Sequence, residues 1–201
     1  MSADGEYVGV STSEMRTLGK YWVKGSSINS KRTFLVDRLG EAAAESLDTF
    51  LSDHGAPQVL EASWYPFQLY DDVLRFVARE FLGGDLKRLR DVGRHSARQS
   101  LTGTYSVFVR PGGFRSFLER SAPFHGRYYS AGSLQLVGAS GDDTSFELVQ
   151  EGAPIYTEPD LEVACGFYCE AAEMMGLWNV TCEYEYTETG VRFLLRSSSA
   201  R

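Results

Sequence analysis

The sequence has few of the features that stabilise secreted or membrane proteins. Its 201 residues include only three cysteines, Cys165, Cys169 and Cys182, an odd number outside any Cys-x-x-Cys spacing. A disulfide framework is therefore not expected, and the thiols should be reduced. The sequence contains no run of about 18 uncharged apolar residues, and its start, MSADGEYVGV, lacks the basic and apolar stretches of a signal peptide. These absences predict a cytoplasmic protein without a membrane-spanning helix.

Positive charge is also scarce. Lysine and arginine number 20 against 27 aspartates and glutamates, which gives a formal net charge of −7. Because nucleic-acid binding depends on a surplus of cations, this balance argues against a nucleic-acid partner. What the chain has in quantity is aromatic residues, 13% of the total, within an otherwise ordinary globular composition.

Known catalytic and metal motifs are missing. The sequence shows no nucleophile elbow, no HExxH, no phosphate loop and no GxGxxG followed by an acid at the proper distance. Its three histidines, His54, His95 and His125, are far apart and near no obvious serine, aspartate or cysteine partner. The sequence therefore predicts a protein that is not an enzyme.

Apolar periodicity predicts a flexible segment at 1–19, one domain over 20–196 and a disordered tail at 197–201. The predicted elements are a strand at 21–25, helices within 28–51 broken at Gly40, helices at 66–82, 86–110 and 114–129, a hairpin at 134–150, a helix at 159–175 and a hairpin at 182–196. Helices that precede strands predict an α+β fold, with an N-terminal helical block packed on a C-terminal antiparallel sheet. That sheet consists of two hairpins separated by a helix.

Several segments resemble a known family when taken together and in order. They are KGSSI, SWYPFQLY, GGDLKRLRDVGRHSARQSLTGTYSVF and RYYSAGSLQL, followed by the terminal hairpin. Over residues 20–196 they resemble a domain family of unknown function that is expanded in myxobacteria and is similar to 4-vinyl-reductase-type small-molecule-binding domains. Wider relatives include aromatic-effector sensing domains, haem nitric-oxide-binding domains and acyl-chain-holding core subunits of the TRAPP complex. The resemblance implies an α+β sensor or scaffold, often dimeric, with an internal apolar cavity.

Departures from these relatives argue against a metal or haem. Where many relatives have the hairpin C-x-x-x-G-x-x-x-C, this chain has Tyr186 and Leu194 around Gly190, so no zinc is expected. The haem branch uses an axial histidine and a Tyr-x-Ser-x-Arg motif that holds the propionates. Here Tyr128 and Ser130 are followed by Gly132 in place of the arginine. We expect no cofactor.

Small residues at helical spacing suggest a groove on the predicted helix 86–110. Gly93, Ala97, Ser100 and Gly103 either let another backbone approach closely or leave room for a ligand. In the second interpretation aromatic residues would form the walls of an apolar pocket. The predicted pocket residues are Phe67, Tyr70, Gly93, Ala97, Ser100, Tyr105, Phe108 and Tyr128.

The same predicted helix has a basic stripe, formed by Lys87, Arg90, Arg94 and Arg98. It is either a solvated face paired with local acids such as Asp91, or a surface that binds a partner protein or an acidic ligand group. Cys165 and Cys169, four residues apart, are interpreted as buried small hydrophobes, with redox sensing as the alternative.

These features together predict a regulatory domain that binds a small hydrophobic or aromatic molecule and signals through contact with another protein, as a homodimer. The alternative is a ligand-free dimeric scaffold that acts only through protein contacts.

Overall fold

The computed structural model describes residues 9, 21–103, 105–121 and 124–198. These residues form two compact units, the first made by the chain up to Leu86 and by Arg127–Ala131, the second by Lys87–Gly126 and by the chain from Gly132 onward. The predicted flexible segment at 1–19 falls outside the described residues, except for Gly9, and so do residues 199–201 of the predicted tail. A single domain over 20–196 therefore stays a prediction.

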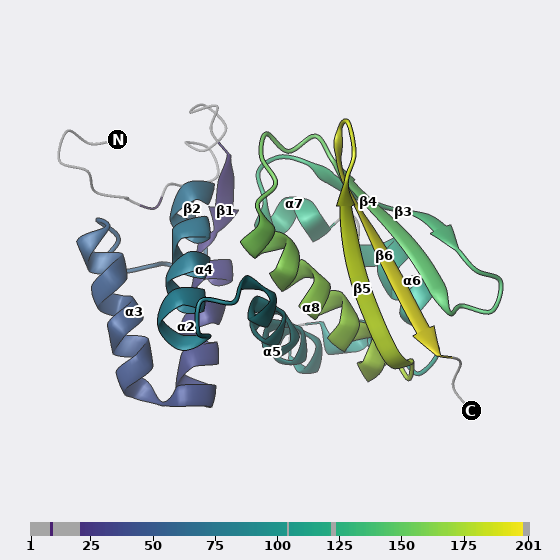
Figure 1. Ribbon diagram of the computed structural model, residues 1–201, viewed down its shortest axis with the longest axis horizontal. Coiled ribbons are helices and arrows are strands. Elements are labelled where there is room, and N and C mark those ends of the chain that lie inside the picture. Colours follow the sequence, from purple (N-terminus) through teal and green to yellow (C-terminus); the bar gives the residue numbers. More distant parts are fainter. Residues whose placement is uncertain (1–8, 10–20, 104, 122–123, 199–201) are drawn as a thin grey trace. The chain divides into compact units, whose positions relative to one another are not determined.

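The first unit consists of three helices and a two-stranded antiparallel ribbon (Figure 1). They are β1 (Trp22–Lys24), α2 (Gly25–Leu39), α3 (Glu41–Asp53), β2 (Trp64–Pro66) and α4 (Phe67–Phe81). The predicted break between α2 and α3 lies at Gly40, and the apolar stripe predicted for α4 forms its buried face, including Leu69, Val73 and Val77. Burial of each such side chain contributes about 1.5–3 kcal/mol to folding, which holds the three helices together.

The second unit has a four-stranded antiparallel sheet in the order β3-β4-β6-β5. Its elements are α5 (Leu89–Thr102), η2 (Ser106–Phe108), α6 (Phe114–Ser121), β3 (Ser133–Ala139), β4 (Ser145–Glu151), α8 (Glu158–Met174), β5 (Trp178–Tyr186) and β6 (Gly190–Ser198). Two short helices, η1 (Leu86–Arg88) and α7 (His125–Tyr128), contain points where the chain passes from one unit to the other. The two predicted hairpins and the helix between them are confirmed, and the fold class is α+β.

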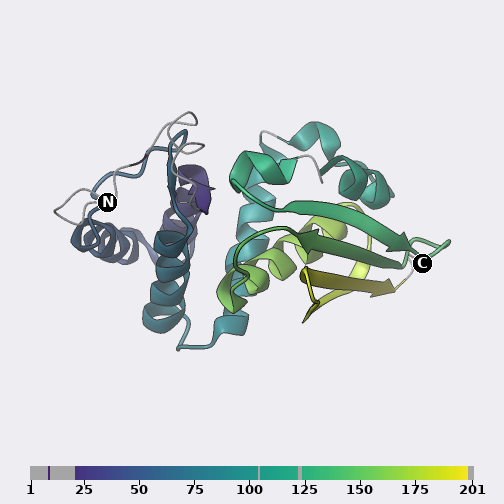
Figure 2. The same ribbon diagram turned by 90° about the horizontal axis from the view of Figure 1, so that it is seen from above.

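One face of the sheet is covered and the other is open. Figure 2 shows α8, in light green, running along the strands, and α5 packs against α8. Strand alternation points Leu148, Cys182 and Phe193 toward this helical layer, where each is fully buried, while Glu183 and Glu185 on the intervening positions are exposed. The covered face of the sheet and the helices on it form the main apolar core of the second unit.

Two predicted helices end earlier than periodicity indicated. The helix predicted for 86–110 is interrupted, because η1 precedes α5, α5 ends at Thr102, and the chain then forms η2. The helix predicted for 114–129 consists of two helices, α6 and α7, with residues 122–123 outside the described part. At the C-terminus, β6 continues to Ser198, two residues past the predicted end of the domain. Among the described helices, none is both long enough and apolar enough to cross a membrane.

Glycines on both helices allow α5 and α8 to meet backbone to backbone. A Cβ atom added to Gly93 of α5 would lie 2.0 Å from the carbonyl oxygen of Val163 on α8. A Cβ atom added to Gly166 of α8 would lie 2.1 Å from the carbonyl oxygen of Arg90 on α5. Both contacts are shorter than van der Waals packing permits, so only glycine fits at either position.

The first prediction concerns this crossing. Gly93→Ala or Gly166→Ala should lower the free energy of unfolding by about 2–3 kcal/mol, because the added methyl group forces the two backbones apart. Urea denaturation followed by circular dichroism measures the change. The matched control is Gly126→Ala, whose new methyl group would meet no atom within 4 Å. The control should change stability by less than about 0.5 kcal/mol, and equal effects of all three substitutions would contradict the close crossing.

Candidate functional site

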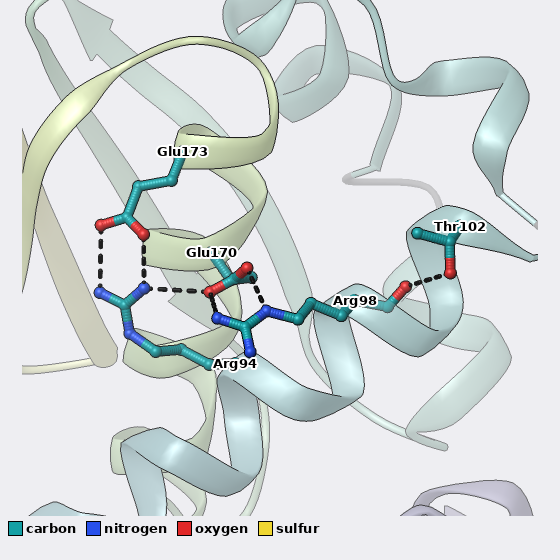
Figure 3. Close-up of polar contacts among 5 residues, drawn as sticks. All are labelled: Arg94, Arg98, Thr102, Glu170 and Glu173. Carbon is teal, nitrogen blue, oxygen red and sulfur yellow. Dashed lines mark hydrogen bonds and ion pairs between the residues drawn. The ribbon is translucent and has the colours of Figure 1, made fainter.

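A ladder of ion pairs joins α5 to α8 beside the glycine crossing. Figure 3 shows the part of it formed by Arg94 and Arg98 with Glu170 and Glu173. Arg90 Nε donates to Glu162 Oε2 at 2.5 Å, Arg94 donates to Glu173 at 2.6 Å and to Glu170 at 3.0 Å, and Arg98 Nε donates to Glu170 Oε1 at 2.5 Å. The side chains of Glu162 and Glu170 are only 3% and 7% exposed, so these carboxylates depend on the arginines for their charge balance. The hydrogen bond to Glu173 is the main cause that raises the pKa of Arg94 above its ordinary value.

These contacts define the surroundings of the basic stripe that the sequence predicted. Arg90, Arg94 and Arg98 already have carboxylate partners within the chain, on α8 rather than at the predicted local acid Asp91. The fourth member, Lys87, lies exposed in η1. A partner-binding role for the stripe stays a prediction, and the arginines have a structural role in addition.

Three thiols lie buried where α8 faces β5. Cys165, Cys169 and Cys182 are between 0% and 4% exposed, as the hydrophobe interpretation predicted. A hydrogen bond with Cys165, together with burial, raises the pKa of Cys182, and burial raises the pKa of the Cys169 thiol to about 11. Thiols held protonated in this way are poor nucleophiles and poor metal ligands. Among the described residues, no group of three or more histidine, cysteine, aspartate or glutamate side chains could hold a metal ion.

Aromatic residues form a stacked cluster in the first unit. The rings of Tyr21 and Phe67 stack with centroids 4.6 Å apart, and the rings of Tyr70 and Tyr129 lie 5.8 Å and 6.4 Å from that of Phe67. Phe67 and Tyr70 are buried, while Tyr21 and Tyr129 are half-buried. The buried rings pack against one another and Lys31 Nζ lies 5.0 Å from the Tyr70 ring centroid, so only the half-buried Tyr21 and Tyr129 expose ring surface in this cluster.

The predicted pocket residues are divided between the two units. Phe67, Tyr70 and Tyr128 belong to the first unit, and Gly93, Ala97, Ser100, Tyr105 and Phe108 belong to the second. Within the second unit, Tyr105 and Phe108 lie 6.3 Å apart and pack on the core, while the half-buried Ser100 accepts a backbone hydrogen bond from Tyr105. A common pocket lined by all eight residues stays a prediction.

Two of the small residues pack closely. The space beside Gly93 is filled by the backbone of α8, and Ala97 is fully buried in the core of the second unit. Both positions agree with close helix packing, the first of the two interpretations, while the ligand groove stays a prediction.

The sequence interpretation missed the acidic half of the ladder. Glu162, Glu170 and Glu173 lie eight and three residues apart along α8, a spacing that keeps them near one face of a helix. Such a stripe could have been matched with the arginines of α5, which recur every four residues. It was missed because the two stripes are more than 70 residues apart in sequence, for example Arg90 and Glu162.

The chain matches no protein-family model and none of the curated proteins. Its fold is nevertheless that of solved H-NOX proteins. An H-NOX protein from S. oneidensis in the Fe(II)NO ligation state has a TM-score of 0.65 at 13% identity, over 88% of this chain and 99% of that one. The unliganded Fe(II) H-NOX protein from K. algicida has a TM-score of 0.60 at 13% identity, over 88% of this chain and 97% of that one. At this identity the comparison shows a shared fold, that of one of the wider relatives named from the sequence.

The residues of this chain do not fit the propionate-binding pattern that the resemblance to haem-binding domains implies. Ser130, the second position of the propionate motif, exchanges hydrogen bonds with the backbone of Trp22 at 2.8 Å and 3.0 Å. Gly132, the third position, has a φ of +86°, and a Cβ atom there would lie 3.2 Å from both the carbonyl oxygen of Glu151 and the Nε2 atom of His125. This backbone strains any side chain at position 132, so an arginine there would carry a conformational cost.

The second prediction tests the ion-pair ladder. Glu170→Gln should lower the free energy of unfolding by about 1–2 kcal/mol, a range between the values for buried and exposed pairs. The intermediate value is expected because Arg94 and Arg98 are 28% and 51% exposed while Glu170 is 7% exposed. Urea denaturation measures the loss, and the same change at the exposed Glu188 of the β5–β6 turn is the control. If both variants lose the same stability, the ladder does not join the helices.

The third prediction concerns the buried thiols. Native protein at neutral pH should resist alkylation by iodoacetamide at all three cysteines, whereas urea-unfolded protein should take up three carbamidomethyl groups, counted by mass spectrometry. Because the pKa of Cys169 is raised to about 11, the free energy of unfolding should depend on pH. The contribution of the protonated Cys169 thiol to stability is present below pH 9.0 and is lost as the pH rises toward about 11. Cys169→Ala should remove that part of the alkaline loss. Alkylation of the native protein at the unfolded rate would contradict the buried, protonated state.

Proposed function

We propose that this chain is a non-enzymatic regulatory domain that binds a small hydrophobic or aromatic molecule, without haem, and signals through contact with another protein. The observation that carries the proposal is the H-NOX fold, matched over 88% of this chain and 97–99% of the S. oneidensis and K. algicida proteins. Those proteins are described by the ligation state of an iron. A shared fold does not by itself transfer a ligand, so the ligand has to be inferred from residues of this chain.

Two features of this chain support an apolar ligand other than haem. The first is Gly132, which replaces the propionate-binding arginine with a crowded backbone position that has no charge. The second is the aromatic cluster around Phe67, in which the half-buried Tyr21 and Tyr129 leave ring surface on which an aromatic molecule of modest size could stack. The buried thiols, with their raised pKa values, support a role without nucleophilic chemistry.

The alternative, a ligand-free dimeric scaffold, is supported by a different observation. A hollow in the second unit, lined by Phe108 and Phe117 among others, has a volume of about 50 Å³. A cavity that accepts benzene measures about 150 Å³. This hollow is therefore too small for an aromatic ligand, and the proposal relies on the first unit for ligand contacts.

The fourth prediction distinguishes these functions by native mass spectrometry of the purified full chain. We expect a co-purifying molecule of roughly a few hundred daltons, the size of an ordinary pocket ligand, and no Soret absorbance after incubation with haemin. Phe67→Leu should lower the occupancy by about tenfold, since loss of ring stacking and fit costs about 1.4 kcal/mol. Phe146→Leu, an equally buried phenylalanine in the second unit, is the control and should keep the wild-type occupancy.

Each other outcome contradicts a defined part of the proposal. A mass that equals the polypeptide alone, with a dimer at twice that mass, supports the scaffold. A stoichiometric haem with a Soret band contradicts the haem-free site. Equal losses in both variants show that the effect of Phe67→Leu is due to general destabilisation.

A further inference from the structure

We propose that the hollow beside η2 and α6 is a docking site for an acidic segment of another protein, with one aliphatic side chain of that segment filling the hollow. This inference refines the protein-contact part of the proposed function. It does not depend on the identity of the small molecule. The size of the hollow, its apolar lining and two arginine side chains point to such a partner.

The hollow is lined by aromatic rings and by an exposed aliphatic side chain. Phe108 and Phe117 contribute ring surface, and Val107 in η2 is 64% exposed to solvent. An aliphatic side chain this exposed gains free energy when a partner covers it. At about 50 Å³, the hollow has room for the end of one aliphatic side chain, and less than an aromatic ring requires.

Two arginines line the same hollow. Among the residues that the structure describes, the side chains of Arg110 and Arg120 make no hydrogen bond or ion pair. Arg115, on the same helix as Arg120, has a different environment, because it donates to Asp143 and to the carbonyl oxygen of Ser140 at 2.7 Å each. Arg110 and Arg120 therefore leave a positive charge at the hollow that is not neutralised within the described chain.

The chain as a whole is acidic. The chain has a net charge of −7, and arginines such as Arg90, Arg94 and Arg98 are neutralised by glutamates. Uncompensated cations around an apolar hollow complement a segment in which acidic residues surround an aliphatic one. Glu119, the acid next to Arg120 in sequence, is exposed and does not line the hollow.

The fifth prediction uses three synthetic peptides and ¹⁵N-labelled full chain. Ac-EDLLDE-NH2 should shift the backbone amide signals of Val107–Arg120 in a saturable manner. Ac-EDGGDE-NH2, which lacks the aliphatic anchor, should bind several-fold more weakly, and Ac-KRLLKR-NH2 should cause no shift in this region. The double variant Arg110→Glu/Arg120→Glu should weaken binding of the first peptide by about tenfold, because two attractive contacts become repulsive.

Two further variants separate docking from folding and from general charge effects. Val107→Ser, a surface change, should weaken binding of Ac-EDLLDE-NH2 by about threefold, since one apolar wall is lost. Arg196→Glu, at an exposed position of β6, changes the charge of the same unit and should leave binding unchanged.

The proposal is overturned by any of three results. These are the absence of saturable shifts at millimolar Ac-EDLLDE-NH2, equal binding of the acidic and basic peptides, and an equal effect of Arg196→Glu and the double variant. Binding to phosphatidylglycerol vesicles without binding to the acidic peptide would likewise overturn it, in favour of a membrane surface. Because these measurements involve no small molecule, failure here is distinct from failure of the ligand test, which is read at Phe67.

Discussion

The second unit depends on the backbone contact between α5 and α8 at Gly93 and Gly166. Because neither position has a side chain, the two helices approach closely enough for arginines of α5 to reach buried carboxylates of α8 directly. On a neighbouring face of α8, Cys165 and Cys169 pack into the apolar core together with Cys182 of β5, so the same helix contacts both the ion-pair ladder and the core. A wider crossing would leave Glu162 and Glu170 buried without cations, which is far more costly than the modest gain from a surface ion pair.

Two sets of arginines in this chain have different consequences. The arginines of α5 form ion pairs with carboxylates of α8 in the same unit, and these pairs fix how the two helices pack. Arg110 and Arg120, beside an apolar hollow, lack such partners among the described residues. The same residue type thus serves folding in one place and is available for recognition in another, and only the surrounding carboxylates distinguish the two.

The fold shared with H-NOX proteins coexists with a glycine at position 132, where the resemblance named from the sequence implies an arginine. Gly132 has a left-handed backbone beside Glu151 and His125, so a side chain at this position would be strained. A fold can host different ligands when the residues of its site change while its core is kept. This chain shares the overall fold, its sheet has the order β3-β4-β6-β5, and the proposed ligand surface is a cluster of aromatic rings.

The sequence by itself determined the elements whose signals are local: the break at Gly40, the apolar face of α4, the two hairpins and the burial of the cysteines. These follow from backbone preferences and from side-chain periodicity, which a short window of residues contains. Tertiary structure alone decided where α5 ends, that Gly93 packs against Val163, and that Arg94 pairs with Glu170 and Glu173. Those outcomes depend on helices more than 70 residues apart meeting in space, and no local pattern specifies which partner a charged or small residue will find.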